Sequence, residues 1–271
     1  MNFEAFAADH GLIIRSLVMD KWTRVPTVDH PHKRNGAYIW DGERGAVQNW
    51  AVHDSPICWA QERSEPVDYE KIRLRAEKAA KEREEAHKVA ASRASKMLKQ
   101  AIPGTHLYLA RKGFPAESGW IWRDKLLIPM RVGPRLVGLQ LISGDGEKKF
   151  LKGQVTHGAA AVFDNKGGNI FVEGYATAMS VRRALKSVRM RYKIWVTFSA
   201  GNLTTVARGK TGIVVADNDA AGLQAAAKTG LLVWCSPKMG EDANDFEMRC
   251  GTEALAEGIR YLTEPSQLSA A

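Results

Sequence analysis

The chain has 271 residues, of which 39 are Lys or Arg and 30 are Asp or Glu, giving a formal net charge of +9. With 45% hydrophobic and 25% charged residues, the composition excludes a disordered chain and suits one large or two smaller globular domains. No apolar run approaches the roughly 18–20 residues of a membrane span, and the acidic start is unlike a secretory signal. We therefore expect a cytoplasmic protein without a membrane partner.

The cysteine count limits the possible covalent and metal cross-links, and the charge indicates a class of partner. Three cysteines far apart in the sequence, Cys58, Cys235 and Cys250, exclude a disulfide framework and a Cys-built zinc site. The excess of positive charge is typical of a protein with a polyanionic partner such as nucleic acid, although many basic proteins have none. The positive charge lies after residue 65, because residues 1–65 carry a net −2, residues 66–100 a net +4 and residues 101–271 a net +7.

Residues 1–64 are predicted to form a small β-rich domain. Two aromatic and β-branched runs, residues 36–40 and 46–50, flank a glycine-containing hairpin turn. Four of the eight tryptophans lie here, at Trp22, Trp40, Trp50 and Trp59. They either fill a small core or form an exposed surface on which bases stack.

Residues 65–104 are predicted to be a charged helical linker. The stretch 66–100 has no glycine and is rich in Ala, Lys, Arg and Glu, which are strong helix formers. Its few apolar positions indicate a mostly solvated helix, and Pro103-Gly104 ends it.

Residues 105–166 return to a β-rich pattern. Residues 125–130 and 135–142 read as two strands around the Gly133-Pro134 turn. A second turn at 143–146 leads into a lysine-containing segment that includes Lys148 and Lys149.

From residue 167 on, strands alternate with helices, which predicts a mainly parallel sheet flanked by helices. The predicted strands are 169–172, 193–198, 212–216 and 231–234, and the predicted helices are 175–189 and 220–228.

Acidic residues follow three of these strands. Glu173 closes the first strand, Asp217 and Asp219 close the third, and Asp242 and Asp245 follow the fourth. The carboxyl ends of parallel strands form the functional edge of such a sheet, so neighbouring strands would bring these acids together. An extended backbone would point Asp217 and Asp219 to the same side. Clustered carboxylates repel, and Mg²⁺ relieves the repulsion, which suits phosphoryl or nucleotidyl transfer.

At these positions the sequence resembles a known family. The segments IFVEGYATA (170–178), IVVADNDAAG (213–222) and GEDAND (240–245) are similar to the three motifs of a Toprim domain. DnaG-type primases, topoisomerases and some nucleases share that module. Ordinary helix caps and turn acids in a flavodoxin-like domain explain each acidic cluster singly, but not the three in this order.

The resemblance extends upstream, where YLARKG (108–113) and the strand pair from Arg123 to Gln140 are similar to the basic half of the DnaG-type catalytic core. Topoisomerases and small Toprim nucleases are not expected to carry this half. EGYATA and SAGNL (199–203) also occur in the Toprim primases of phages and mobile elements. The implied fold is therefore a Toprim catalytic domain over 167–271, of α/β class, preceded by a basic β-rich subdomain and the small N-terminal domain.

The resemblance implies roles for the acids. Glu173 matches the catalytic glutamate, and Asp217 and Asp219 match the catalytic, metal-binding pair. Asp242 and Asp245 match auxiliary metal-site acids, with the choice among Asp242, Asn244 and Asp245 left open. Glu173 is also a candidate metal ligand.

It implies contacts to nucleotide or nucleic acid as well. Lys149, and after it Lys148, match basic residues that meet phosphates, although a lysine is most often a solvated surface group. The other candidates for these contacts are Arg111, Arg123, Asn202, Lys238, Lys33 and Arg34. Asn202 could equally cap a loop, and the segment 30–35 that holds Lys33 and Arg34 could be an ordinary polar turn.

The first domain departs from the family pattern. DnaG-type primases begin with a zinc ribbon, and here the ribbon outline lacks its cysteines. His30 and His32 alone cannot complete a tetrahedral site, so we expect no zinc.

The resemblance implies a DNA primase that uses Mg²⁺ or Mn²⁺ to join ribonucleotides into short primers on single-stranded DNA, in a bacterial host's cytoplasm. Its partners would be the DNA template, NTPs and a separate replicative helicase, since Gly209-Lys210-Thr211 lacks the glycine that Walker A needs. A Toprim nuclease and a non-catalytic adaptor that binds single-stranded DNA are the alternatives.

Overall fold

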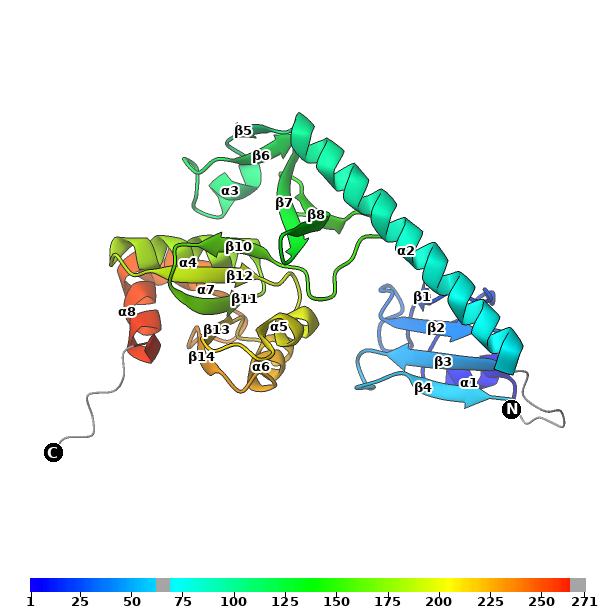
Figure 1. Cartoon of the computed structure of the whole chain (residues 1–271). Helices are drawn as coiled ribbons and strands as arrows, with labels where there is room; N and C mark the ends of the chain where they lie inside the picture. The colour runs from blue at the N-terminus through cyan, green and yellow to red at the C-terminus, as the bar shows by residue number, and fades with distance from the viewer. Residues whose placement is uncertain (62–68, 264–271) are drawn as a thin grey trace. The chain divides into compact units, whose positions relative to one another are not determined.

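The computed structural model describes residues 1–61 and 69–263, and the chain divides into two compact units, residues 1–73 and the residues from 74 on. Figure 1 shows the elements of both units. The predicted division into four domains stays a prediction, and its residues 62–68 and 264–271 lie outside the described part. Within the described part, no helix combines the length and apolar character that crossing a membrane requires.

The first unit is a four-stranded antiparallel sheet with strands in sequence order and a short helix packed against it. The Phe3 ring lies 5.4 Å from the Trp59 ring and 5.9 Å from the Tyr38 ring, between centroids, so one side chain packs against both the second and the fourth strand. The elements are α1 (Phe3–Asp9), β1 (Thr23–Val25), β2 (Gly36–Trp40), β3 (Arg44–Asn49) and β4 (Ile57–Ala60).

The tryptophans of this unit divide between the core and the surface. Trp40 and Trp59 pack against the core around Phe3. Trp22 and Trp50 are exposed, and the Arg24 guanidinium lies 3.9 Å from the centre of the Trp50 ring. Half of the set therefore builds the core, and the other half faces solvent.

Helix α2 (Tyr69–Gln100) carries charged residues along most of its length, as predicted. Its last third differs from the predicted solvated helix. Ala94 and Met97 are buried there against Leu127 and Leu139 of the strands that follow and against Leu151. The apolar residues of the linker thus anchor its end to the second unit.

A five-stranded antiparallel meander follows, with its strands in sequence order. The two predicted strands form its centre, and a bulge at Met130 and Arg131 interrupts their register. The elements are β5 (Ile102–Gly104), α3 (Leu107–Arg111), β6 (Gly119–Trp122), β7 (Lys125–Val132), β8 (Arg135–Ile142) and β9 (Lys148–Phe150).

The last sheet has the order β10-β12-β11-β13-β14, and its last four strands are parallel, which confirms the predicted mainly parallel sheet. β10 runs antiparallel at the edge, and the sequence pattern predicted neither this strand nor the helices α5, α7 and α8. The strands are β10 (Ala161–Asp164), β11 (Gly168–Val172), β12 (Tyr192–Val196), β13 (Ile213–Ala216) and β14 (Leu232–Cys235). The helices are α4 (Tyr175–Ser187), α5 (Ala200–Ala207), α6 (Ala220–Ala227), α7 (Ala243–Cys250) and α8 (Thr252–Thr263).

Alternate residues of the parallel strands pack into two cores, one on each face of the sheet. Ile170 and Val172 pack against α4, α7 and α8, whereas Phe171 packs against α5 and α6 on the other face (Figure 1). The first of these cores continues into the meander through Leu126 and Ile128. The meander and the parallel sheet therefore form one packed body.

Phe3→Ala should destabilise the first unit by about 3–5 kcal/mol, because the substitution removes a buried ring that contacts four aromatic neighbours. Urea unfolding of the full chain, followed by tryptophan fluorescence, measures the loss. Trp50→Ala is the control, since it removes an exposed ring of the same unit. Equal stability of the two variants would contradict this account of the core.

Candidate active site

The pairing of β11 with β13 brings two predicted acids together. Val172 pairs with Val215 in parallel register, Glu173 follows β11 directly, and Asp217 follows β13 directly. The two carboxylates therefore leave neighbouring strands at the same edge of the sheet, as the sequence predicted for neighbouring strands.

These acids line a pocket of about 540 Å³ that both halves of the second unit build. The parallel sheet and its loops supply carboxylates, while the meander and α3 supply basic and polar groups. The acids are Glu173, Asp217, Asp242 and Asp245 from the first half and Asp145 from the second. The facing groups are Tyr108, Arg111, Lys112, Gln140 and Lys148.

The carboxylates raise one another's pKa values. Burial raises the pKa of Asp217 to about 7, and the charges of Asp242, Glu173 and Asp219 add to the rise. Burial also raises the pKa of Glu173, with a contribution from Asp219. Lys148 opposes both shifts, so this lysine is a nearby positive charge. The pocket thus holds more negative charge than its own cations balance.

Asp219 and Asp242 are also the N-caps of helices. Asp219 accepts a hydrogen bond from the Gly222 N–H (2.7 Å) at the start of α6, and Asp242 accepts one from the Asp245 N–H (2.9 Å) at the start of α7. Each bond engages one carboxylate oxygen and leaves the other available to a ligand. The caps hold the two acids in place.

The backbone between the paired aspartates is not extended, which corrects that part of the sequence analysis. The Asp219 N–H donates to the Asp217 carbonyl oxygen (2.9 Å), so the chain turns at Asn218. As a result Asp217 lines the pocket, whereas Asp219 is exposed outside the lining and acts on it through its charge.

The donor set fits a hard divalent cation only in part. Among the described residues, no three Asp, Glu, His or Cys side chains are close enough to hold one ion by themselves. However, Asp217 Oδ1 is buried and has no hydrogen-bond partner in the described part of the chain. Mg²⁺ commonly binds one or two carboxylates and keeps several waters, so an all-oxygen set around Asp217 fits it.

The basic candidates lie in different places. Arg111 and Lys148 line the pocket. Lys149 does not: alternation along β9 turns it away, and it forms a 2.8 Å ion pair with Glu147 while 69% exposed. The geometry therefore favours Lys148 over Lys149, the reverse of the order that the sequence analysis gave.

The remaining basic candidates lie outside the pocket lining. Arg123 lies in the turn between β6 and β7, 4.3 Å from the Trp122 ring. Lys238 pairs with Glu241 (3.2 Å). Lys33 and Arg34 are exposed on the first unit, just before β2.

Two asparagines have structural roles. Asn202 accepts from the Gly158 N–H (2.7 Å) and donates to the carbonyl oxygens of Ala159 and Thr197, so it fastens the loop before β10 to α5. Asn244 is fully buried and donates to the Lys112 carbonyl oxygen (2.9 Å) and to Ser180 Oγ (3.0 Å). Of the three residues left open in the acidic segment, Asp242 and Asp245 line the pocket and Asn244 does not.

An ion pair with a buried carboxylate joins the two halves of the pocket, and no sequence pattern predicted it. Arg183 on α4 donates twice to Glu247 on α7, at 2.7 Å each, and also to the Gly113 carbonyl oxygen (2.8 Å). The neighbouring Lys112 forms an ion pair with Asp245 (3.6 Å). These bonds and that of Asn244 fix the loop after α3 against the acidic edge.

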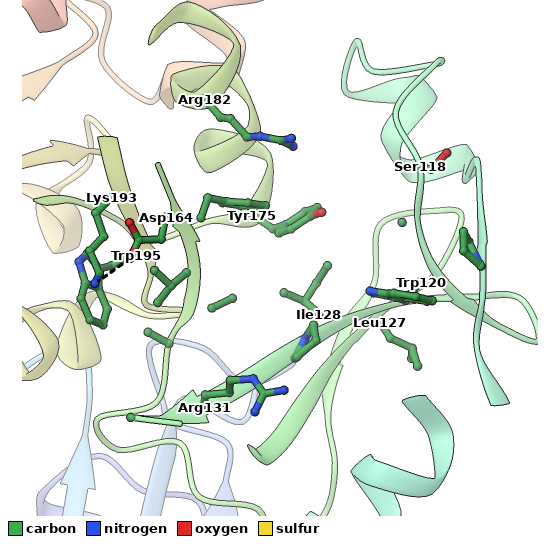
Figure 2. Close-up of a pocket in the computed structure, with 18 of the residues that line it drawn as sticks. Ser118, Trp120, Leu127, Ile128, Arg131, Asp164, Tyr175, Arg182, Lys193 and Trp195 are labelled. Atoms are coloured by element: carbon green, nitrogen blue, oxygen red, sulfur yellow. Dashed lines mark ion pairs between the residues drawn. The ribbon is translucent and has the colours of Figure 1, made fainter. Parts of the chain in front are cut away.

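A larger cleft, of about 770 Å³, lies beyond the first turn of α4. Tyr175 faces this cleft, whereas its neighbours Gly174 and Ala176 line the acidic pocket. Figure 2 shows Trp120 and Tyr175 on opposite sides of the gap, with the pair of Asp164 and Lys193 (2.9 Å) at one edge. Among the described residues, Asp164 is the one carboxylate that lines this cleft, so the acidic cluster belongs to the smaller pocket.

Comparison with known proteins agrees with the motif assignment. Residues 169–253 match the family model of the Toprim domain, so the chain contains a Toprim domain. A chain in the solved structure of bacteriophage T7 lagging-strand DNA polymerase interacting with primase domains of two gp4 subunits, bound to an RNA/DNA hybrid and dTTP, is also similar. It is 17% identical with a TM-score of 0.40, over 56% of this chain and 85% of that chain.

Asp217→Asn should stabilise the metal-free protein, because it removes a half-buried charge among other carboxylates. Relief of about 1 kcal/mol corresponds to a rise in Tm of about 2–4 °C in a unit of this size. The gain should be full above pH 7, where the wild-type carboxyl is ionised in both states, and should be lost below about pH 4, where its pKa of about 7 when folded and 3.8 when unfolded leaves it protonated in both.

Adding Mg²⁺ should raise the Tm of the wild type and leave that of Asp217→Asn unchanged, as differential scanning fluorimetry can measure. Glu257→Gln, on the exposed side of α8, is the charge-matched control. An Asp217→Asn variant that melts below the wild type in EDTA would contradict the repulsion argument.

Arg183→Met should destabilise the second unit by about 3 kcal/mol, because it leaves the buried Glu247 carboxylate without its charge partner. Asp164→Asn breaks the more exposed pair with Lys193 and should cost less than about 1 kcal/mol. Denaturant unfolding of the two variants gives both values, and similar losses would show that the Arg183 pair has no special weight.

Proposed function

We propose that this protein is a DNA primase that joins ribonucleotides into short primers on single-stranded DNA. The observation that carries the proposal is the composition of the pocket, in which Toprim carboxylates face Arg111 and Lys148 from the upstream half. A polymerising enzyme needs both, because it must hold metal ions and also the phosphates of a nucleotide and a strand.

Each group has a task in this reaction. The primer 3′-hydroxyl oxygen bonds to the α-phosphorus of an NTP, the bond from that phosphorus to the bridging oxygen breaks, and pyrophosphate leaves. Arg111 and Lys148 bind the phosphates, and Glu173 accepts the hydroxyl proton from its place beside Asp217. Asp217 would hold Mg²⁺ or Mn²⁺ together with retained waters, and the charges of Asp242 and Asp245 would add to the attraction; the ion would supply positive charge to the attacking and leaving oxygens.

The other parts of the proposal rest on the sequence. The template and NTPs are the proposed partners, with a replicative helicase as a separate chain in a bacterial cytoplasm. The exposed Trp22 and Trp50, with Lys33 and Arg34, make the first unit a candidate for contacts to the template.

Asp217→Ala and Glu173→Gln should each lower primer synthesis by at least about 10²-fold, because both remove groups at the reacting phosphate. The assay incubates protein, single-stranded DNA, labelled NTPs and Mg²⁺ or Mn²⁺, and resolves the products on a gel. Alkali-sensitive products of a few nucleotides are expected from the wild type and from the control Glu257→Gln.

The alternatives predict different outcomes in the same assay. Metal-dependent shortening of the DNA without NTPs would establish the nuclease. DNA binding without products, unchanged in Asp217→Ala and with no Mg²⁺-dependent rise in Tm, would establish the adaptor. Full synthesis by both active-site variants would rule out the proposed site.

A further inference from the structure

Strand β9 presents two different side chains to the same side. Lys148 and Phe150 are two residues apart on this strand, so they share one face, and Lys149 between them points to the other. Lys148 lines the acidic pocket, and Phe150 lines an adjoining pocket of about 360 Å³. Two residues of strand span roughly 6.6 Å, which is about the scale of one nucleoside.

Phe198 joins the two pockets. It lines both of them, and its N–H donates to the Glu173 carbonyl oxygen (2.9 Å), which places it beside the catalytic candidate. Its ring meets that of Phe150 edge to face, with 6.2 Å between centroids and 89° between planes. The two rings form an apolar wall that continues the acidic pocket away from its charges.

The backbone of Phe198 is in an unusual conformation. Its φ is +69°, in the left-handed region that a bulky side chain rarely occupies. Such a conformation is strained and persists where the surrounding structure enforces it. Here it follows the end of β12 and turns the ring toward β9, where Phe150 is 44% exposed.

The rest of the adjoining pocket suits a flat, polar-edged group. Thr156, His157 and Ser199 lie around the aromatic wall, so hydrogen-bonding side chains surround an apolar face. A nucleobase has this character, with a π-face for stacking and polar atoms at its edge. A phosphate belongs instead beside Lys148 and Arg111.

We propose that the Phe150–Phe198 wall binds the base of the nucleoside triphosphate whose phosphates lie at Lys148 and Arg111. Two side chains of β9 then contact the same nucleotide. Lys148 binds its phosphates, and the Phe150 ring stacks on its base. The nature of the ligand rests on the proposed function, whereas the test below measures binding and does not require turnover.

The test compares ATP with inorganic tripolyphosphate, each with Mg²⁺, by isothermal titration calorimetry. Phe150→Ala should weaken ATP binding by about 5–100-fold, the loss typical of one base–aromatic contact, and leave tripolyphosphate binding unchanged. Phe150→Trp should restore ATP binding. Lys148→Ala should weaken both ligands by a similar factor.

The controls separate stacking from general damage. Tyr261→Ala removes an aromatic ring that is 78% exposed on α8 and should leave the affinity for both ligands unchanged. The inference is overturned if Phe150→Ala binds ATP as the wild type does, if it loses both ligands equally, or if wild-type affinity does not depend on the base.

The outcome is separable from that of the proposed function. Base-dependent ATP binding that requires Phe150, without primer synthesis, would retain this inference and remove the primase. Primer synthesis, together with ATP binding that does not change when Phe150 is replaced, would retain the primase and remove this inference.

Discussion

The ion pair between Arg183 and Glu247 is the contact on which the pocket depends. Glu247 is almost fully buried, and Arg183 also reaches the backbone at Gly113, so one guanidinium joins α4, α7 and the loop after α3. Removing one partner of such a pair is costly, because it leaves an uncompensated buried charge. The basic half and the acidic half of the site are therefore held in a fixed relation, with Asn244 as a second fastening.

That rigid frame allows the site to keep an unfavourable charge arrangement. Asp217 is half-buried, one of its oxygens has no partner in the described part of the chain, and its neighbours carry the same charge. A cation removes the cost when it binds, and until then the packing of the sheet maintains the arrangement. The stored repulsion gives the pocket selectivity for ligands that bring positive charge, such as a divalent cation.

Much of the acidic edge could be predicted from the sequence, because the buried parallel strands of this sheet are apolar runs and acidic residues follow them directly. The apolar runs before Glu173 and Asp217 predicted the strands β11 and β13. The structure shows that these two strands are paired neighbours, which brings the two acids together. The choice between Lys148 and Lys149 could not be predicted, since a shift of one residue in a strand's phase exchanges its two faces. The turn at Asn218 and the hydrogen bonds of Asn244 depend on residues that are far away in the sequence. Such contacts leave no pattern among neighbouring residues from which they could be predicted.

The capping roles of Asp219 and Asp242 affect how this site could change in evolution. A descendant that lost its activity would be free to replace Glu173, because α4 begins at Gly174 without a side-chain cap. Positions 219 and 242 would still be selected for Asp, Asn, Ser or Thr, since α6 and α7 each use that side chain to begin. An aspartate retained at those two positions is thus a weaker sign of a working enzyme than a glutamate retained at 173.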